Sequence, residues 1–434
     1  QECQPAPLPL VPALGMRGWR TIGVMTNFVA TSDWGFAHGF DVWDDSLASG
    51  HVGASADKAA ELALRYLDQP TDPDAEVEPA GVFLFVWLFD PHYRYEAHEG
   101  LHFGPGYGEL KEHPYAGKLT GTEKLDDLQK NRANFTPDDV AFLRGNYASE
   151  VANVDRAVGT LLGALKERKL YDDALIVFSA DHGEEILDRG WLGHSVTLYD
   201  ELVRVPLVFR LPNGMADERR GQVIEHPVSL IDMGATLVDL MSPTKVDREQ
   251  LELGHSRSFV PTLVRGETPA RRFLYLHTNF EPVVKAGANP DRSAYQFGVF
   301  DAARGLKWFV DHKVEAGMEP RAALFDLARD PGEQTNLAGT EGAAEKALSL
   351  QRLRGLVPKS VLLLGLKSMT HDPGMRLVLG LVWPHLRLSV RMEALAFWLI
   401  VYATFANWFA TLLSAATGAG GTMPLASAGQ VGAP

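Results

Sequence analysis

Apolar runs and amphipathic stretches alternate along the first half of the chain. The apolar runs at residues 21–28, 81–89 and 174–179 are short and rich in strand-forming side chains, which predicts strands. Residues 54–66, and the stretch that begins near Leu230, carry the spacing of amphipathic helices. This alternation predicts an α/β fold with a doubly wound, mostly parallel sheet, in which residues 174–179 form a central parallel strand.

Strong local signals predict one long helix in the middle of the chain. Thr136 is a good N-cap, Pro137 suits the first helical position, and Asp139 places an acid at the third. Apolar residues then recur at helical spacing over residues 140–165. The helix is therefore expected to end near Arg168, just before the predicted strand.

The pattern changes in the second half of the chain. Within residues 252–337 the apolar runs become shorter, at 273–277, 297–300 and 307–311, which predicts a smaller antiparallel α+β subdomain. After residue 358 basic residues outnumber acidic ones, whereas the chain before it is acidic. The predicted domains are an α/β core at 1–250, a small C-terminal subdomain at 251–357 and a tail at 358–434.

Composition and charge narrow the classes of partner. The net charge of −14 argues against a general affinity for nucleic acid or anionic membrane surfaces, because both depend on excess Lys and Arg. The single cysteine, Cys3, excludes an internal disulfide framework and a cysteine-based zinc cluster. An anionic substrate must therefore be held by local groups.

The sharpest chemical motif is the sequence SADHGEE at residues 179–185, which follows a predicted strand at a carboxyl end of the sheet. Asp181 and His182 are adjacent, and the glycine after them lets the chain turn both side chains toward one cation. A carboxylate oxygen with an imidazole nitrogen suits Mn²⁺, Fe²⁺ or Zn²⁺ better than a pure oxygen cage would. The structural alternative is an Asp N-cap beside a surface His at a strand-to-helix turn.

Two further histidines are candidate catalytic residues. His194 follows a glycine in a predicted loop, where an imidazole can donate to an anionic oxygen or protonate a leaving group. His92 follows Asp90 and Pro91 at the end of the strand at 81–89, so it is aimed at the same edge of the sheet. Each has a plainer explanation, a solvated loop residue for His194 and a structural turn for His92.

These motifs occur in an order that resembles the sulfatase family of the alkaline phosphatase superfamily. The resemblance rests on Asp90-Pro-His92, the helix segment from Tyr147 to Asp155, and residues 170–173, 179–185, 193–195 and 199–207. Patterns common in the family also occur at residues 18–21, 39–44 and 324–337. The resemblance covers about residues 15–340 and implies an alkaline-phosphatase-like fold.

The resemblance also implies a function. It is metal-dependent hydrolysis of small-molecule sulfuric monoesters, or in some relatives of phosphoric or phosphonic monoesters. Asp181 and His182 would bind one divalent cation, Mn²⁺ or Ca²⁺, and the Asp-His pair resembles the choline-sulfatase and phosphonate-monoesterase branches, which favours manganese. His194 would lie near the bridging oxygen of the ester, and His92 would contact its anionic group.

The sequence departs from the family pattern at the nucleophile. Family members carry, ahead of these motifs, a strand ending in two metal-binding acids and then Cys or Ser followed by x-Pro-x-Arg, and neither feature occurs here. Cys3 begins a partial mimic in which Pro7 stands in place of the Arg, which we attribute to chance. A catalytically inactive sulfatase-fold remnant with weak metal binding is therefore an alternative, and so is a phosphoryl-group transferase of the same superfamily.

The tail carries a different signal. Residues 394–416 contain no charged side chain and are long and apolar enough to cross a bilayer, with Arg387 and Arg391 before them. This predicts a hydrophobic C-terminal helix that associates with the membrane, and the alternative is a buried core helix. Residues 373–430 resemble part of the hydroxylaminobenzene mutase family of small membrane proteins, with no site to transfer. The expected location is the membrane or the periplasmic, extracytoplasmic side.

Overall fold

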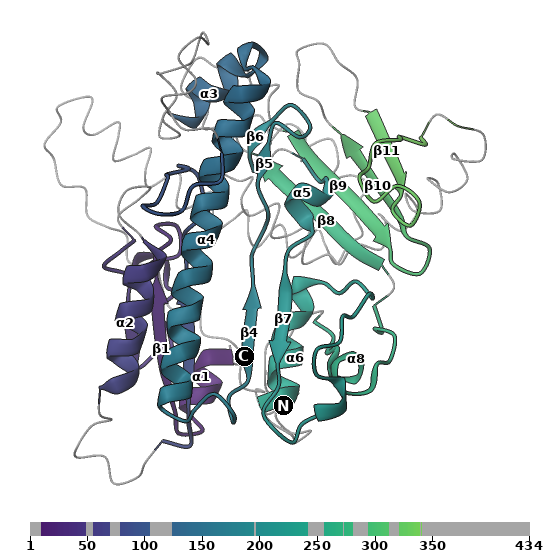
Figure 1. Ribbon diagram of the computed structural model, residues 1–434. Coiled ribbons are helices and arrows are strands. Elements are labelled where there is room, and N and C mark those ends of the chain that lie inside the picture. The colour runs from purple at the N-terminus through teal and green to yellow at the C-terminus, as the bar shows by residue number, and fades with distance from the viewer. Residues whose placement is uncertain are drawn as a thin grey trace, which may run out of the picture. The chain divides into compact units, whose positions relative to one another are not determined.

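The computed structural model describes the chain between residues 10 and 340, with gaps (Figure 1). The described residues are 10–48, 55–69, 79–104, 124–194, 197–241, 256–271, 273–280, 294–311, 321–338 and 340. The chain divides into two compact units, Gln1–Pro358 and Lys359–Pro434, and every described residue lies in the first. The predicted membrane helix at 394–416 lies outside the described residues and stays a prediction. Within them, no helix combines the length and the apolar character of a bilayer span.

A three-stranded parallel sheet begins the fold. Its central strand, β1 (Trp19–Met25), pairs with β2 (Val42–Asp44) on one side and with β3 (Gly81–Trp87) on the other. The strands predicted at 21–28 and 81–89 are therefore confirmed within a few residues. Because the three strands are parallel, the loops that follow them leave from one edge of the sheet, where open α/β folds bind ligands.

The long helix α4 spans Pro137–Glu167, as its cap and its apolar spacing predicted. The Thr136 hydroxyl accepts a hydrogen bond from the Asp139 backbone N–H at 3.3 Å, and the Asp139 carboxylate accepts one from the Thr136 N–H at 2.9 Å. This capping box satisfies two N–H groups at the start of the helix. A cap of this kind stabilises a protein by about 1 kcal/mol.

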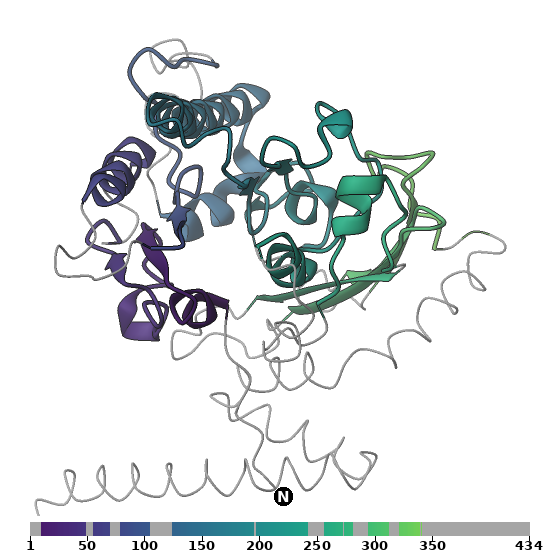
Figure 2. The same cartoon turned by 90° about the horizontal axis from the view of Figure 1, so that it is seen from below.

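Helix α2 (Ala56–Asp68) packs on the parallel sheet, and α4 runs beside α2 (Figures 1 and 2). Val24 of β1 forms a fully buried cluster with Ala59 and Ala63 of α2, against which Leu161 of α4 packs. The short alanine side chains let the helix approach the strand closely. Burial of this apolar face, more than helix propensity, holds α2 in place.

The strand β4 (Ile176–Ser179) differs from the prediction. It pairs with β7 (Leu207–Arg210) in an antiparallel ladder, and among the described residues these two strands form a sheet of their own. The expected central parallel strand is therefore wrong. Phe178 and Val208 are 37% and 57% exposed, so the ladder is not buried on both faces as a parallel core strand would be. A short apolar run fixes neither the direction nor the partner of a strand, because both depend on residues far away in the sequence.

Four antiparallel strands form another sheet, which is curved (Figure 2), in the order β11-β10-β9-β8. Its strands are β8 (Phe273–Phe280), β9 (Ala294–Asp301), β10 (Leu306–Asp311) and β11 (Arg321–Asp326). Trp308 and Leu324 are buried on one face, and Phe309 and Phe325 on the other. This alternation confirms the predicted antiparallel region, although β11 was not predicted.

Several shorter helices and strands lie before and between these elements. They are α1 (Leu10–Gly15), α3 (Leu125–Asn131), β5 (Glu185–Ile186), β6 (Leu192–Gly193), α5 (Asp200–Val203), α6 (Met233–Met241) and α8 (Val260–Arg265). The helix expected to begin near Leu230 starts as a 3₁₀ turn, Leu230–Asp232, and continues as α6.

A buried ion cluster links the antiparallel sheet to α5. The ammonium group of Lys307 on β10 lies 2.7 Å from Oδ1 of Asp200 and 2.7 Å from Oε1 of Glu333. The Lys307 side chain is 1% exposed and that of Glu333 is fully buried. Opposite charges without solvent must be paired, so each of these residues depends on the others for its place in the core.

Candidate functional site

Three histidine rings meet where the chain leaves β3, β4 and β6. The centroids of the His182 and His194 rings are 4.2 Å apart, and those of His92 and His194 are 4.8 Å apart. Asp181 lies beside His182, with its Oδ2 3.4 Å from the ring Nε2. The structure therefore brings together all four residues singled out from the sequence, although they come from segments up to about a hundred residues apart.

The tautomer of His182 follows from its hydrogen bond. Nδ1 lies 2.8 Å from the carbonyl oxygen of Gly183, which can only accept, so Nδ1 carries the proton. The lone pair of the neutral ring is then on Nε2, which faces the Asp181 carboxylate. The two side chains are 39% and 47% exposed, so a cation could reach them from solvent. This donor set fits a divalent cation, but among the described residues no third His, Cys, Asp or Glu completes it.

Gly183 explains how the loop after β4 reaches this geometry. A Cβ at this position would collide with the carbonyl oxygen of Glu201, so no larger residue fits without moving the backbone. The Gly183 N–H donates to the carbonyl of Leu202 at 2.8 Å. The loop that carries Asp181 and His182 is thus fixed against α5.

Glu184 holds His194 from the buried side. Its Oε1 lies 3.2 Å from Nδ1 of His194, and 5% of its side chain is exposed. Burial alone lowers the pKa of His194, but the hydrogen bond to Glu184 and the charges of Glu184 and Asp181 outweigh it, so the pKa is raised. Burial, and then the Glu184 charge, raises the pKa of Tyr147 to about 12. Sequence reasoning missed Glu184, although its position next to the Asp-His-Gly motif was a signal.

His92 is oriented by its own loop. Its Nδ1 lies 2.5 Å from the carbonyl oxygen of Tyr93, which again places the proton on Nδ1. The ring stacks on Phe89 at a centroid distance of 4.4 Å. A stacked ring with a defined tautomer can present Nε2 as an acceptor, or, when protonated, as a donor to an anionic group.

Comparison with known proteins gives two family matches. Residues 38–243, which contain all four candidate residues, match the model of the family described as Sulfatase. Residues 374–434 match the model described as Styrene oxide isomerase. The second match falls on the segment that resembles the hydroxylaminobenzene mutase family, and it is weakly consistent with that resemblance. The segment lies outside the described residues.

Curated relatives match about half of this chain. Arylsulfatase K of Bos taurus is 25% identical over 224 residues, which are 51% of this chain and 38% of the relative. The multifunctional alkaline phosphatase superfamily protein PehA of Trinickia caryophylli is 27% identical over 255 residues, which are 56% of this chain and 47% of the relative. The chain thus spans less than half the length of these relatives. These matches support the sulfatase and alkaline phosphatase superfamily for the matched segment.

Solved structures show the same fold at lower identity. The phosphonate monoester hydrolase of Agrobacterium radiobacter is 22% identical with a TM-score of 0.51, covering 79% of this chain and 80% of that one. The protein BT4656, solved with its substrate D-glucosamine-2-N,6-O-disulfate, is 16% identical with a TM-score of 0.55, covering 79% of this chain and 80% of that one. At these identities the likeness supports an α/β, alkaline-phosphatase-like fold and nothing finer.

Proposed function

We propose that this chain hydrolyses small-molecule sulfuric monoesters, or phosphoric or phosphonic ones, with one divalent cation bound by Asp181 and His182. The observation that carries the proposal is the convergence of Asp181 with His92, His182 and His194 at one point of the fold. The matched segment of arylsulfatase K and PehA supports the same reaction class.

Each residue has a role in the proposed reaction. A bound cation would stabilise negative charge on the transferred group. His92 binds the anionic group of the ester. His194, whose raised pKa favours the protonated ring, gives its proton to the alkoxide as the bond between sulfur and the bridging oxygen breaks. The products are an alcohol and inorganic sulfate. Water supplies the new oxygen of the sulfate, and of its two protons one restores the protonated His194 ring and the other is released to solvent.

The choice of metal follows from the donors. An imidazole nitrogen favours Mn²⁺ over Ca²⁺, which prefers oxygen ligands in larger number. Two protein ligands alone bind a divalent cation weakly, so the substrate's own oxygen atoms would contribute to the site. Manganese is therefore the metal we expect to support the reaction best, with Ca²⁺ as the alternative.

A second candidate function is binding without turnover. This is the alternative of an inactive sulfatase-fold remnant, and its support is the exposed Asp181–His182 pair, which can bind a cation whether or not an ester is turned over. In that case the chain keeps the metal pair and the anion-binding histidines but cannot complete the displacement. We propose hydrolysis first because the leaving-group side of the site is fully oriented, from Glu184 to His194.

The proposal also includes the location of the protein in the cell. An extracytoplasmic or membrane-associated enzyme would suit the apolar tail at 394–416. Fractionation of cells that produce the full chain and a chain ending at residue 357 tests this, since only the full chain should sediment with membranes.

The reaction is tested with a panel of esters. The full chain is incubated with an aryl sulfate, an aryl phosphate and an aryl phosphonate monoester, each with Mn²⁺ or Ca²⁺, with and without an added alcohol. Metal-dependent release of phenol with free sulfate or phosphate supports hydrolysis. Transfer of the group to the added alcohol would instead identify a transferase. Absence of turnover on every ester, with anion binding retained, would overturn hydrolysis in favour of the binding function.

A further inference from the structure

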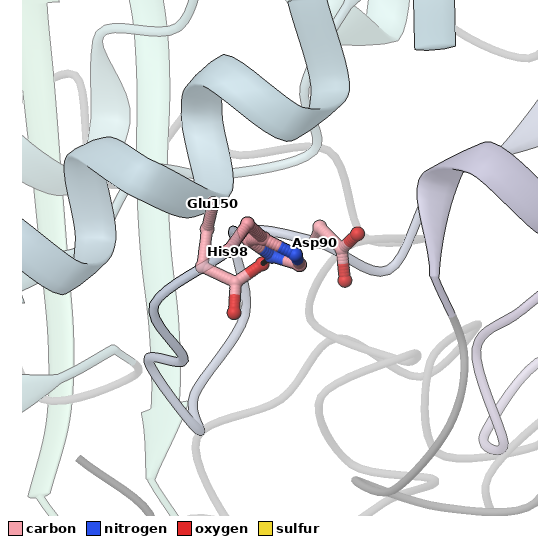
Figure 3. Close-up of side chains that lie close together, drawn as sticks. All are labelled: Asp90, His98 and Glu150. Atoms are coloured by element: carbon pink, nitrogen blue, oxygen red, sulfur yellow. Dashed lines mark hydrogen bonds and ion pairs between the residues drawn. The ribbon is translucent and has the colours of Figure 1, made fainter. Parts of the chain in front are cut away.

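A second cluster of metal-ligating side chains is built around the loop that carries His92 (Figure 3). Asp90 follows β3, His98 lies further along the loop after it, and Glu150 projects from the middle of α4. One ligand atom from each of the three residues lies within 4.8 Å of the other two. None of these residues takes part in the proposed hydrolysis.

The separations suit one bound cation. Nε2 of His98 lies 2.8 Å from Oε2 of Glu150. Two ligand atoms on the same transition metal, each at about 2.1 Å, lie about 3.0–3.5 Å apart. Movements of roughly an ångström or less in the three side chains would therefore bring all of them to bonding distance of a single ion. Two carboxylates with one imidazole form a donor set typical of Zn²⁺, Mn²⁺ or Co²⁺.

The remaining oxygens of the two carboxylates are oriented by outer hydrogen bonds. Oε1 of Glu150 accepts from the Glu96 N–H at 2.8 Å. Oδ2 of Asp90 accepts from the Ala56 N–H at 2.8 Å and from Asn153 at 3.1 Å, while Oδ1 has no donor among the described residues. Such outer partners fix ligand side chains in metal sites, and here they leave one oxygen of each carboxylate for an ion.

The two carboxyl groups of the cluster also favour a bound cation. The Glu150 side chain is 5% exposed, and Asp90 is partly buried beside it. Burial, and then the charge of Asp90, raises the pKa of Glu150 to about 7, and burial raises the pKa of Asp90. The two carboxyl groups of Asp90 and Glu150 therefore have only the imidazole of His98, within the cluster, to balance their negative charge. A divalent ion would neutralise both carboxylates at once.

We propose that Asp90, His98 and Glu150 form a second divalent-cation site, for Zn²⁺ or a similar transition-metal ion, distinct from the Asp181–His182 pair. The ion would tie the loop of residues 90–98 to α4. That loop carries His92, so the second ion would hold a residue of the first site in place without contacting the substrate. The inference does not depend on the proposed hydrolysis.

The test isolates the second site from the first. Zn²⁺ binding to the full chain is measured by equilibrium dialysis in an Asp181→Asn, His182→Gln background, so that the first pair no longer contributes. We expect one equivalent of Zn²⁺ in this background. Adding Glu150→Gln or His98→Gln should remove that equivalent or weaken its binding at least about tenfold. The matched control Glu167→Gln, which alters an exposed carboxylate of the same helix, should retain it.

A spectroscopic measurement adds the identity of the ligands. Co²⁺ bound in the same background should show visible absorption that is lost with His98→Gln. The His98 side chain is 22% exposed and lies in a loop, so this variant stays informative even if Glu150→Gln fails to fold. The proposal is overturned if the background binds no metal, or if it binds the same amount with and without His98→Gln.

Discussion

Oε1 of Glu184 lies 3.2 Å from Nδ1 of His194, and the Glu184 side chain is buried, with 5% of it exposed. The contact fixes which nitrogen of His194 faces the protein, and leaves the other for chemistry. Tyr95 and Tyr147 lie close enough to Glu184 for its charge to raise the pKa of both phenols, after burial as the larger cause. Glu184 is therefore a positioning residue, buried among tyrosines, for the proposed proton donor.

Replacing this carboxylate should impair turnover more than binding. Glu184→Gln keeps the size of the side chain but removes the charge that orients His194, so we expect kcat to fall about 10- to 100-fold with little change in KM. Steady-state kinetics on the best ester of the panel measure the two constants. The control Glu61→Gln, at an exposed carboxylate of α2, should change neither. An effect on KM alone would contradict the positioning role.

Glu185, the next residue, should make stability depend on pH. It is 1% exposed, and burial raises its pKa from 4.5 to about 7. A carboxyl group whose pKa is raised in the folded state stabilises the fold fully below its unfolded pKa, and this contribution is lost as pH rises through the folded value. The protein should therefore lose stability from about pH 4.5 to pH 7, by up to about 3 kcal/mol from this group.

Glu185→Gln should reduce that dependence, since an amide does not titrate. Its oxygen can still accept from the N–H groups of Arg189 and Trp191, and its NH2 group can donate to the Thr197 hydroxyl, which accepts in place of donating. Urea unfolding at pH 5 and pH 8 gives the free energy of unfolding for the wild type and the variant. The difference between the two pH values should be smaller in the variant. Equal differences in both proteins would show that Glu185 is charged throughout this range.

Lys307→Met should destabilise the protein strongly. The substitution removes the ammonium group nearest to the buried Glu333 and leaves Arg189, 3.9 Å from its Oε2, as the neighbouring cation. Breaking a buried pair costs up to about 3–5 kcal/mol. Thermal or urea unfolding measures the loss, with Lys58→Met on the exposed side of α2 as the control. Adding Glu333→Gln to Lys307→Met should recover part of the stability. A loss as small as that of the control would mean that solvent reaches the cluster.

The sequence predicted those parts of the fold that depend on residues close together along the chain. The start of α4 depends on Thr136 and Asp139, which are three residues apart, so the chain itself contains the whole signal. The strand positions likewise follow from short apolar runs. The pairing of β4 with β7 was not predictable in this way, because residues 176–179 pair with residues 207–210, which lie about thirty positions further along the chain.

The same distinction holds for the residues of the candidate sites: some lie in sequence motifs, and others are brought together only by the fold. Asp181, His182, His92 and His194 could be chosen from sequence because motifs of known chemistry contain them. Glu150 lies in the helix segment that resembles the family, but nothing in that segment marks it as a metal ligand, and His98 is 52 residues away outside the motifs named above, so only the folded chain brings the two together. Glu184 is intermediate, since it lies within the motif at residues 179–185 but its partner, His194, is ten residues away.

The most direct test of the proposed function compares two substitutions at opposite ends of β4. Asp181→Asn removes a proposed metal ligand, whereas Asp173→Asn alters an exposed carboxylate before the strand and serves as the matched control. With Mn²⁺ and the best ester of the panel, the rate of phenol release should fall about 100-fold or more in Asp181→Asn and stay unchanged in Asp173→Asn. Equal rates in both variants would contradict the assignment of the metal site and, with it, the proposed mechanism.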